Sequence, residues 1–206
     1  MGRHVSPPAR RIRMSAADRR TAILDAAMEA FASGGYHGTS IDDIASAAGI
    51  SKALIYEHFR SKRDLHATLI ALQADELFGR LRANASPDRE ADERLRGGVD
   101  AFLGFVEERR EAWRALFRDA ADPELGEVGE SVQRDATQAI VALMLADEHT
   151  RVDAEADVEI VAQMLSGAVQ ALANWWYDHQ EVPREVLVDR VMAFAWLGLE
   201  RLRAAV

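Results

Sequence analysis

Residues 35–65 read GYHGTSIDDIASAAGISKALIYEHFRSKRDL, and the order of their residues predicts two short helices joined by a tight turn. Thr39 or Ser40 can cap the first helix, because an aspartate follows three residues later in either register. Gly49 stands where this helix should end. Many helices are followed by a residue in the left-handed conformation, which glycine adopts easily because it has no Cβ. This stretch therefore decides how the N-terminal part of the chain folds.

The second short helix should begin after Ser51 and present one apolar and one polar face. Ile55 and Phe59 lie four residues apart, so both point inward. The outward positions are Lys52, Leu54, Tyr56 and His58. Hydrogen-bond donors beside an apolar side chain suit base edges, thymine methyl groups and phosphates. Two short helices around a glycine-containing turn form the helix-turn-helix pattern, whose second helix enters the major groove. On spacing alone, a helical hairpin with a merely solvated polar face remains the alternative.

The same stretch follows an ordered series of residue types without a gap. The series is Gly35, Tyr36, Thr39, Ser40, Ile44, Ala45, Ala48, Gly49, Ile50, Ser51, Ile55, Tyr56, His58, Phe59, Lys62 and Leu65. In this series the chain resembles the N-terminal signature of TetR-family transcriptional regulators, over its first third. The outward face and the resemblance together predict DNA contacts by Thr39, Ser40, Ser51, Lys52, Ala53, Leu54, Tyr56, His58 and Lys62. The resemblance assigns Thr39, Tyr56 and Lys62 to phosphates. Leu54 departs from the family pattern, where a small or hydroxyl residue is frequent, so the operator sequence is not implied.

Charge is divided unevenly along the chain. The net charge is -9, yet residues 1–64 hold ten Lys/Arg against seven Asp/Glu. A basic end on an acidic body would orient the protein on DNA and make binding sensitive to salt. Residues 1–14 contain four arginines and Pro7-Pro8. We expect this segment to be a flexible basic arm, with a contact in the minor groove or to phosphates as the alternative.

Several classes of protein are disfavoured by what the sequence lacks. There is no cysteine, hence no disulfide framework and no thiolate metal site. The apolar runs 139–146 and 192–199 are shorter than the roughly 20 residues of a membrane span, and the basic N-terminus has no apolar signal region. An enzyme built on a helical bundle is the competing class, but no histidine lies three residues after a glutamate and no HExxH, P-loop or GxSxG occurs. We expect a cytoplasmic protein with no membrane partner, enzymatic activity, cofactor or metal.

Composition predicts an all-α fold. Apolar residues make up 49% of the 206, Ala, Leu, Arg and Glu are abundant, and strand-like alternation is scarce. We expect an arm at 1–14, a helix-turn-helix domain at 15–64 and a larger effector-binding and dimerisation domain at 65–206. Within them, the first helix should end at Gly34-Gly35. Further helices should cover about 62–83, 87–109, 123–147, 153–178 and 183–203, with a short amphipathic piece at 111–119.

The last two helices carry apolar stripes with small residues between them. An intramolecular hairpin explains such stripes, whereas the family resemblance implies a four-helix bundle made with a second copy. The candidate residues for a dimer interface are Leu165, Leu172, Val188, Met192, Trp196 and Leu199. A twofold dimer would place two recognition helices about 34–36 Å apart, one turn of DNA, and would read a palindrome.

Aromatic residues and methionines in the middle helices are candidates for an effector site. They are Phe102, Phe105, Trp113, Phe117, Met144, Met164, Asn174 and Trp175. At helical spacing such residues are also ordinary core, and only Asn174 offers a polar anchor. The expected effector is a largely apolar small molecule that shifts the dimer away from the DNA-binding spacing. Repression is the commoner mode in the family that the chain resembles, with activation as the alternative.

Overall fold

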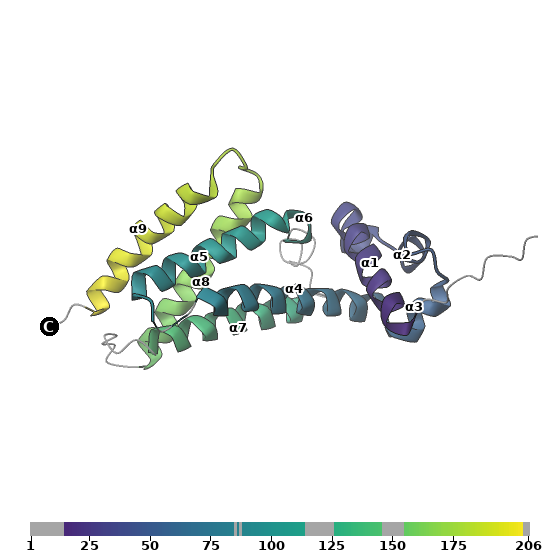
Figure 1. Ribbon diagram of the computed structural model, residues 1–206, viewed down its shortest axis with the longest axis horizontal. Helices are drawn as coiled ribbons and strands as arrows, with labels where there is room; N and C mark the ends of the chain where they lie inside the picture. Colours follow the sequence, from purple (N-terminus) through teal and green to yellow (C-terminus); the bar gives the residue numbers. More distant parts are fainter. Residues whose placement is uncertain (1–14, 85, 87, 114–125, 146–154, 204–206) are drawn as a thin grey trace, which may run out of the picture.

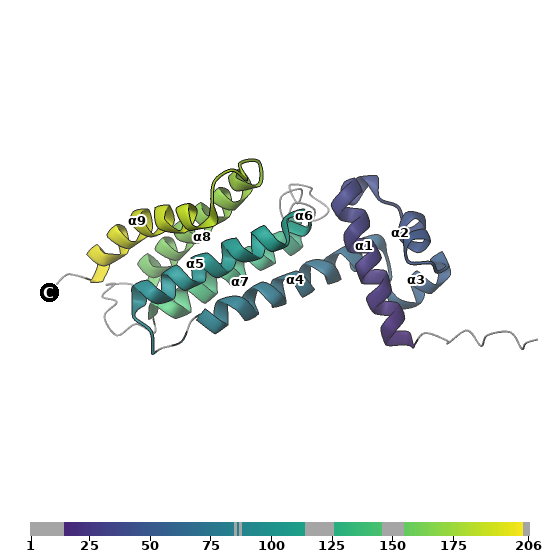
Figure 2. The ribbon, with the colours of Figure 1, turned by 45° about the horizontal axis from the view of Figure 1, so that its top comes forward.

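The computed structural model describes residues 15–84, 86, 88–113, 126–145 and 155–203, and the regular structure within these ranges is helical. The helices are α1 (Ala16–Gly38), α2 (Ile41–Ala47), α3 (Lys52–His58), α4 (Lys62–Asn84), α5 (Ala91–Glu108), α6 (Arg110–Trp113), α7 (Gly126–Leu145), α8 (Glu155–Tyr177) and α9 (Arg184–Arg203). The molecule is elongated, with α1, α2 and α3 gathered at one end and α4 running from them alongside the other helices (Figures 1 and 2). The expected all-α fold is confirmed.

The ends of α1 follow the expected local chemistry. The Ser15 hydroxyl accepts a hydrogen bond from the Asp18 backbone N–H at 3.1 Å, and the Asp18 carboxylate reaches back to the Ser15 backbone. Gly35 has a φ of 70°, which breaks the helical path where the sequence predicted an end. One more helical turn follows this kink, and it turns Tyr36 into the core. α5 begins later than expected, at Ala91, because the preceding residue is extended.

A first cluster of buried side chains joins α1, α2 and α3 to the beginning of α4. Its large members are Ile23, Leu24, Phe31, Tyr36, Ile41, Ile44, Ile55, Phe59, Leu65, Leu69 and Ile70. His66 is also fully buried here, with its ring 5.2 Å from that of Phe31 and 5.0 Å from that of Tyr36. The first two turns of α4 thus belong to the core of the N-terminal helices, although α4 continues into the body.

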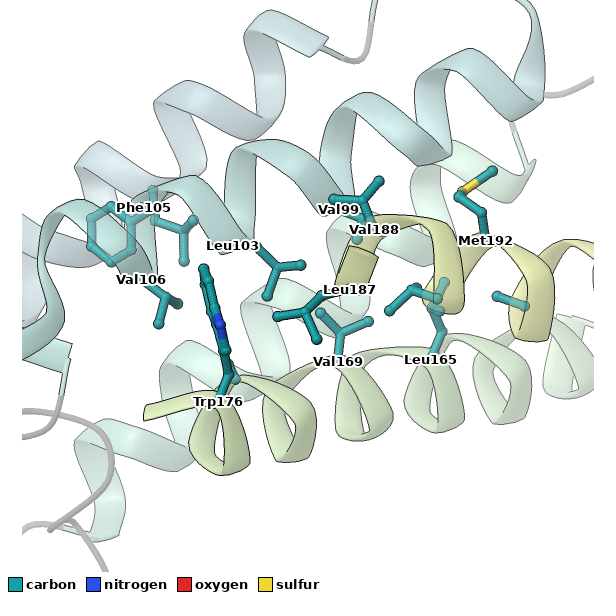
Figure 3. Packing of buried hydrophobic residues seen from close by; sticks show 14 of the residues in the cluster. Val99, Leu103, Phe105, Val106, Leu165, Val169, Trp176, Leu187, Val188 and Met192 are labelled. Atoms are coloured by element: carbon teal, nitrogen blue, oxygen red, sulfur yellow. The ribbon is translucent and has the colours of Figure 1, made fainter. Parts of the chain in front are cut away.

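A second cluster fills the body, where α8 and α9 close onto α5. Its members are Leu77, Val99, Leu103, Phe105, Val106, Trp113, Leu165, Val169, Ala173, Trp176, Leu187, Val188, Val191, Met192 and Ala195. In Figure 3, Leu103 and Leu187 lie between the other labelled side chains, with Trp176 and Val169 rising from α8. One chain therefore buries an apolar face of each of its last two helices.

Three residues expected at a dimer interface lie in this core. Leu165, Val188 and Met192 are buried within one chain (Figure 3), and Leu172 packs against the same cluster while staying partly exposed. This burial does not fit an interface role for the three residues, because α8 and α9 are apolar on more than one face and the faces chosen from the sequence are those turned inward. The side chains of Trp196 and Leu199 lie outside the described residues.

The N-terminal helices touch the body at points other than α4. α6 lies against α1, as both ribbon views show. Val132 of α7 packs against the first cluster. The N-terminal helices are therefore attached to the body through α6 as well as through the continuous helix α4.

Candidate nucleic-acid interface

The two short helices are built by the caps that the sequence offers. The structure selects Ser40 rather than Thr39 as the cap of α2: the Ser40 hydroxyl accepts from the Asp43 N–H at 3.1 Å, and the Asp43 carboxylate accepts from the Ser40 N–H at 2.8 Å. Gly49, with a φ of 65°, ends α2. The Ser51 hydroxyl then caps α3 by accepting from the Leu54 N–H at 3.3 Å. The helix-turn-helix geometry thus follows from local hydrogen bonds.

The capping box of α2 also has a pH dependence. Hydrogen bonds from the Ser40 side chain and backbone hold the pKa of the Asp43 carboxyl below its usual value of 3.8. A depressed pKa stabilises the folded state at pH values above the unfolded pKa. This contribution is lost as the pH falls through the folded pKa, so α2 should be sensitive to strong acid and indifferent to pH near neutrality.

The outer face of α3 is available to a ligand. Ile55 and Phe59 are buried, and this fixes which side of the helix faces out. Ser51, Lys52, Ala53 and Tyr56 are exposed, with 49% of Tyr56 accessible. Leu54 and His58 are half-buried at the edges of this face, and Ser40 is exposed at the start of α2. The structure therefore brings most of the residues expected at DNA to one surface.

Lys52, the basic residue in the first turn of α3, already has an acidic neighbour. Its Nζ lies 2.9 Å from Asp42 Oδ2 in the first turn of α2, and both side chains are largely exposed. The hydrogen bond and the negative charge of Asp42 raise the pKa of Lys52 above its usual value. Lys52 is charged at neutral pH, but it must exchange a carboxylate for a base or a phosphate when DNA arrives.

Asp42→Asn should therefore tighten binding to DNA of any sequence, by roughly twofold to fivefold at low salt, because it removes a negative charge beside the phosphates. Fluorescence anisotropy with operator and random duplexes measures this effect. Asp135→Asn on the exposed face of α7 changes the net charge equally, far from α3. An equal gain in both variants would show that total charge, and not the release of Lys52, is responsible.

The side chains of Thr39 and Lys62 make hydrogen bonds within the protein. Thr39 is only 4% exposed, and its hydroxyl lies 2.9 Å from the Ala30 carbonyl and 2.8 Å from that of Gly35. The Lys62 ammonium donates to the carbonyl oxygens of Tyr36 at 2.8 Å and Thr39 at 3.1 Å, and it lies 4.2 Å from the centre of the Tyr36 ring. The phosphate role implied for the Thr39 hydroxyl does not fit its burial. Lys62 fastens the end of α1 to the start of α4.

Lys62→Met should destabilise the N-terminal helices by about 1.5–3 kcal/mol, the range for hydrogen bonds that involve a charged group. The variant keeps the apolar stem and loses both carbonyl contacts. Urea unfolding measures the change. Lys52→Met is the matched control, because it removes an exposed lysine on the neighbouring helix and should leave unfolding nearly unchanged. Weakened DNA binding with unchanged unfolding would instead assign Lys62 to a phosphate.

The expected effector residues divide into two groups. Phe105 and Trp113 are buried, and Phe102 meets the Trp113 ring edge-on at 5.4 Å. Asn174 Oδ1 accepts a hydrogen bond from Trp113 Nε1 at 3.1 Å, so α5, α6 and α8 meet at these residues. Met144 is half-buried on α7.

Met164 and Trp175 are 66% and 45% exposed, and this exposure does not fit a place in an enclosed effector site. They lie on a face of α8 that turns away from the body, whereas the residues of the first group lie inside it. Phe117 lies outside the described residues.

A hollow of about 390 Å³ lies elsewhere, between α4, α5 and the start of α9. Its lining residues are Arg80, Ala83, Asn84, Asp100, Ala101, Gly104, Glu108 and Arg184. Arg80 lies 2.7 Å from Glu108 and Arg184 lies 3.0 Å from Asp100, so the cations are already paired. Arg80 also lowers the pKa of Glu108. This hollow contains none of the expected effector residues.

Over the described ranges, neither a metal site nor a membrane span is suggested by the structure. The histidine, aspartate and glutamate side chains of these residues form no group suited to hold a metal ion. The helices found there are also too short or too polar to cross a bilayer.

Comparison with known proteins connects both halves of the chain to one family. The model for bacterial regulatory proteins of the tetR family matches residues 23–69, and that for the tetracyclin repressor-like C-terminal domain matches residues 91–198. The transcriptional activator FasR of Mycolicibacterium smegmatis is 27% identical over 187 residues, which cover 90% of this chain and 84% of FasR. A TetR-like regulator from Rhodococcus sp. RHA1 superimposes with a TM-score of 0.74 and 30% identity, covering 91% of this chain and 99% of its own.

The regulator FadR of Bacillus subtilis, solved in complex with stearoyl-CoA, has the same fold. Its TM-score is 0.74 at 19% identity, with 90% of this chain and 98% of FadR covered. The matched proteins are regulators rather than enzymes, and the match extends over both the helix-turn-helix and the body. The chain therefore belongs to the TetR family of DNA-binding transcriptional regulators.

Proposed function

We propose that the chain acts as a homodimer that binds a palindromic operator through α3 of each copy and leaves it when a small, largely apolar effector binds. The observation that carries this proposal is the outer face of α3, whose polar side chains are exposed while Ile55 and Phe59 anchor the helix from behind. A helix supported in this way can enter a major groove without losing its own packing.

Within this face each residue type has a chemical role. Lys52 can donate to guanine O6 and N7 once it leaves Asp42. Ala53 and Leu54 suit thymine methyl groups, and His58 sits at the edge of the surface. The Tyr56 hydroxyl suits a phosphate, as do the hydroxyls and N–H groups at the starts of α2 and α3. Because α3 has only seven residues, one copy offers few base contacts and two copies are needed for a specific site.

The surface proposed for the second copy is the exposed apolar face of α8 and α9. On α8 it consists of Ile160, Met164, Gly167, Ala168, Ala171 and Trp175. On α9 it includes Val186, Ala193 and Phe194, of which Phe194 is 74% exposed, and the exposed Arg190 lies between Val186 and Phe194. The α8 residues carry no charge, so the same face of another copy meets no like-charge repulsion, and the small residues permit close approach. This face replaces the buried residues expected from the sequence.

The chain could act as a repressor or as an activator of transcription. We propose repression, in which the dimer covers a promoter and the effector releases it, as is common in the family that the chain resembles. Activation is the second candidate, and it is favoured by the similarity to FasR, a protein named as an activator that matches along 90% of this chain. Fusing the operator-bearing promoter to a reporter and deleting the gene separates the two, because expression rises for a repressor and falls for an activator.

The effector is proposed to bind where α5, α6 and α8 meet, beside Phe102, Trp113 and Asn174. The aromatic rings suit an apolar molecule, and the Asn174 amide suits its polar group. FadR of Bacillus subtilis shares the fold and holds stearoyl-CoA, which supports an acyl chain as the first ligand class to test.

The test begins with selection of an operator from a random duplex library at low salt. We expect a palindrome, and an affinity that falls about 100-fold or more between roughly 50 and 200 mM salt if four or more phosphates are contacted. Stearoyl-CoA is then added, with coenzyme A alone as the control. Failure to select any sequence would reject the operator, whereas operator binding that stearoyl-CoA leaves unchanged would reject only the acyl effector.

A further inference from the structure

The short helix α6 is fastened to the C-terminal end of α8 at two points. Trp113 Nε1 donates to Asn174 Oδ1 at 3.1 Å. One turn earlier, the Arg110 guanidinium donates to the Tyr177 carbonyl and lies 4.6 Å from the centre of the Tyr177 ring. Arg110 and Trp113 are three residues apart, as are Asn174 and Tyr177, so the two helices meet in register. We call these four residues the α6 clasp.

The other side of α6 faces the DNA-binding end of the molecule. α6 lies against α1, and both ribbon views show it between α1 and the rest of α5. α1 in turn shares one buried cluster with α3, through Phe31 and Ile55 among others. The Arg20 guanidinium on α1 also lies 5.1 Å from the centre of the Phe59 ring, just past the end of α3. A displacement of α1 therefore carries α3 with it.

A second attachment matters because one helix alone constrains orientation poorly. α4 connects the N-terminal helices to the body, and a single helix can bend along its length even though its first two turns are packed in the first cluster. Contact through α6 adds a point away from the α4 axis and removes part of that freedom. The outer face of α8, opposite its buried side, carries Met164 and Trp175 of the proposed dimer surface. The α6 clasp thus lies on a continuous path of packed elements from the dimer surface to α3.

We infer that the α6 clasp sets the distance and angle between the two recognition helices of the dimer, with Arg110 and Trp113 as positioning residues for operator binding. This inference rests on the proposed homodimer and deepens it. Neither residue needs to touch DNA. Loosening the clasp should leave each α3 able to bind its own half-site while the preference for one half-site spacing declines.

Trp113→Phe tests the clasp, because it removes the indole N–H and keeps an aromatic ring in the core. Trp176→Phe is the matched control. Trp176 is equally buried and lies on α8, but its Nε1 donates to the Val182 carbonyl at 2.8 Å, away from α6. Affinities are measured for the selected operator, for versions with one base pair inserted or removed between the half-sites, and for a single half-site.

Trp113→Phe should bind the selected operator about threefold to tenfold more weakly, the size expected for one hydrogen bond, and should discriminate less between spacings. Binding to the single half-site should change less than about twofold, and Trp176→Phe should match the wild type. Asn174→Leu is the second variant. It removes the same hydrogen bond from the α8 side, so the test remains possible if Trp113→Phe folds poorly. Because both changes break one bond, their losses should not multiply in the double variant.

Equal losses in Trp113→Phe and Trp176→Phe, or equal losses on half-site and full operator, would overturn the clasp. Multiplying losses in the double variant would do the same. Thermal unfolding of each variant shows whether weaker operator binding is explained by a loss of protein stability alone. A wild-type protein that is monomeric, or that selects no palindrome, would overturn the proposed function together with the clasp, and this result is visible before any variant is made.

Discussion

Phe194→Glu should separate the proposed dimer into monomers and abolish binding to a full operator. Phe194 is 74% exposed in one chain and belongs to the exposed apolar surface of α8 and α9, and grouped exposed apolar residues mark interaction sites. Burying a glutamate there would leave a carboxylate without a partner against an apolar face, so we expect the dimer to weaken about 100-fold or more. Light scattering over a range of concentrations measures the mass, and anisotropy measures operator affinity.

The controls for this variant place the same charge on exposed leucines elsewhere. Leu72 on α4 and Leu145 on α7 are large, apolar and exposed, but neither lies on α8 or α9. Leu72→Glu and Leu145→Glu should remain dimeric. Met164→Glu, on the uncharged face of α8, should behave like Phe194→Glu. If Phe194→Glu and Met164→Glu both kept the wild-type mass, the second copy would have to bind another surface.

Ile55→Ala should unfold the DNA-binding end while leaving the body intact. Ile55 is the fully buried residue of α3 and packs in the first cluster, so truncation removes apolar contacts and leaves a cavity. The expected loss is about 2–5 kcal/mol, enough to abolish DNA binding at ordinary temperatures. All four tryptophans lie at or after position 113, so their fluorescence reports on the body alone. Circular dichroism should therefore show loss of helix at urea concentrations where tryptophan fluorescence is still native.

Leu54→Ala, one residue earlier on the same helix, is the matched control. Leu54 is half-buried on the outer side of α3, so its truncation should cost little stability and should alter base preference instead. Coincident loss of both spectroscopic signals in Ile55→Ala would mean that the N-terminal helices and the body unfold as one cooperative unit. Equal destabilisation by the two variants would mean that the assignment of inner and outer faces of α3 is incorrect.

The features that were predictable from the sequence are those whose causes lie within a few residues. The Ser51 cap, the glycine that ends α2 and the inward pair on α3 all depend on neighbours at most four positions away. The alternatives at Thr39 and Ser40 show the limit of such reasoning. Both have an aspartate in place for a capping box, and the choice falls on Ser40 because Thr39 is drawn toward the carbonyls of α1.

Contacts between distant segments were not predictable in the same way. Nothing near Lys62 in the sequence indicates that its ammonium binds the end of α1, 26 and 23 residues earlier. The sequence pattern assigns no role to His66, yet its ring fills an aromatic core position beside Phe31 and Tyr36. The one signal available was its place beside Leu65 and near Leu69 on the buried side of α4.

The sequence by itself determined the order of the helices, the Ser51 cap, the family and the inner face of α3, because helical period and capping are local and the signature is dense. The tertiary structure decided which apolar face of α8 and α9 is turned inward and how α6 joins α8 to α1. It also decided that Lys62 makes internal hydrogen bonds to backbone carbonyls. These depend on which surfaces meet when helices pack. A periodic pattern that is apolar on several sides does not specify its partner, since burial against any of them removes similar apolar area from water.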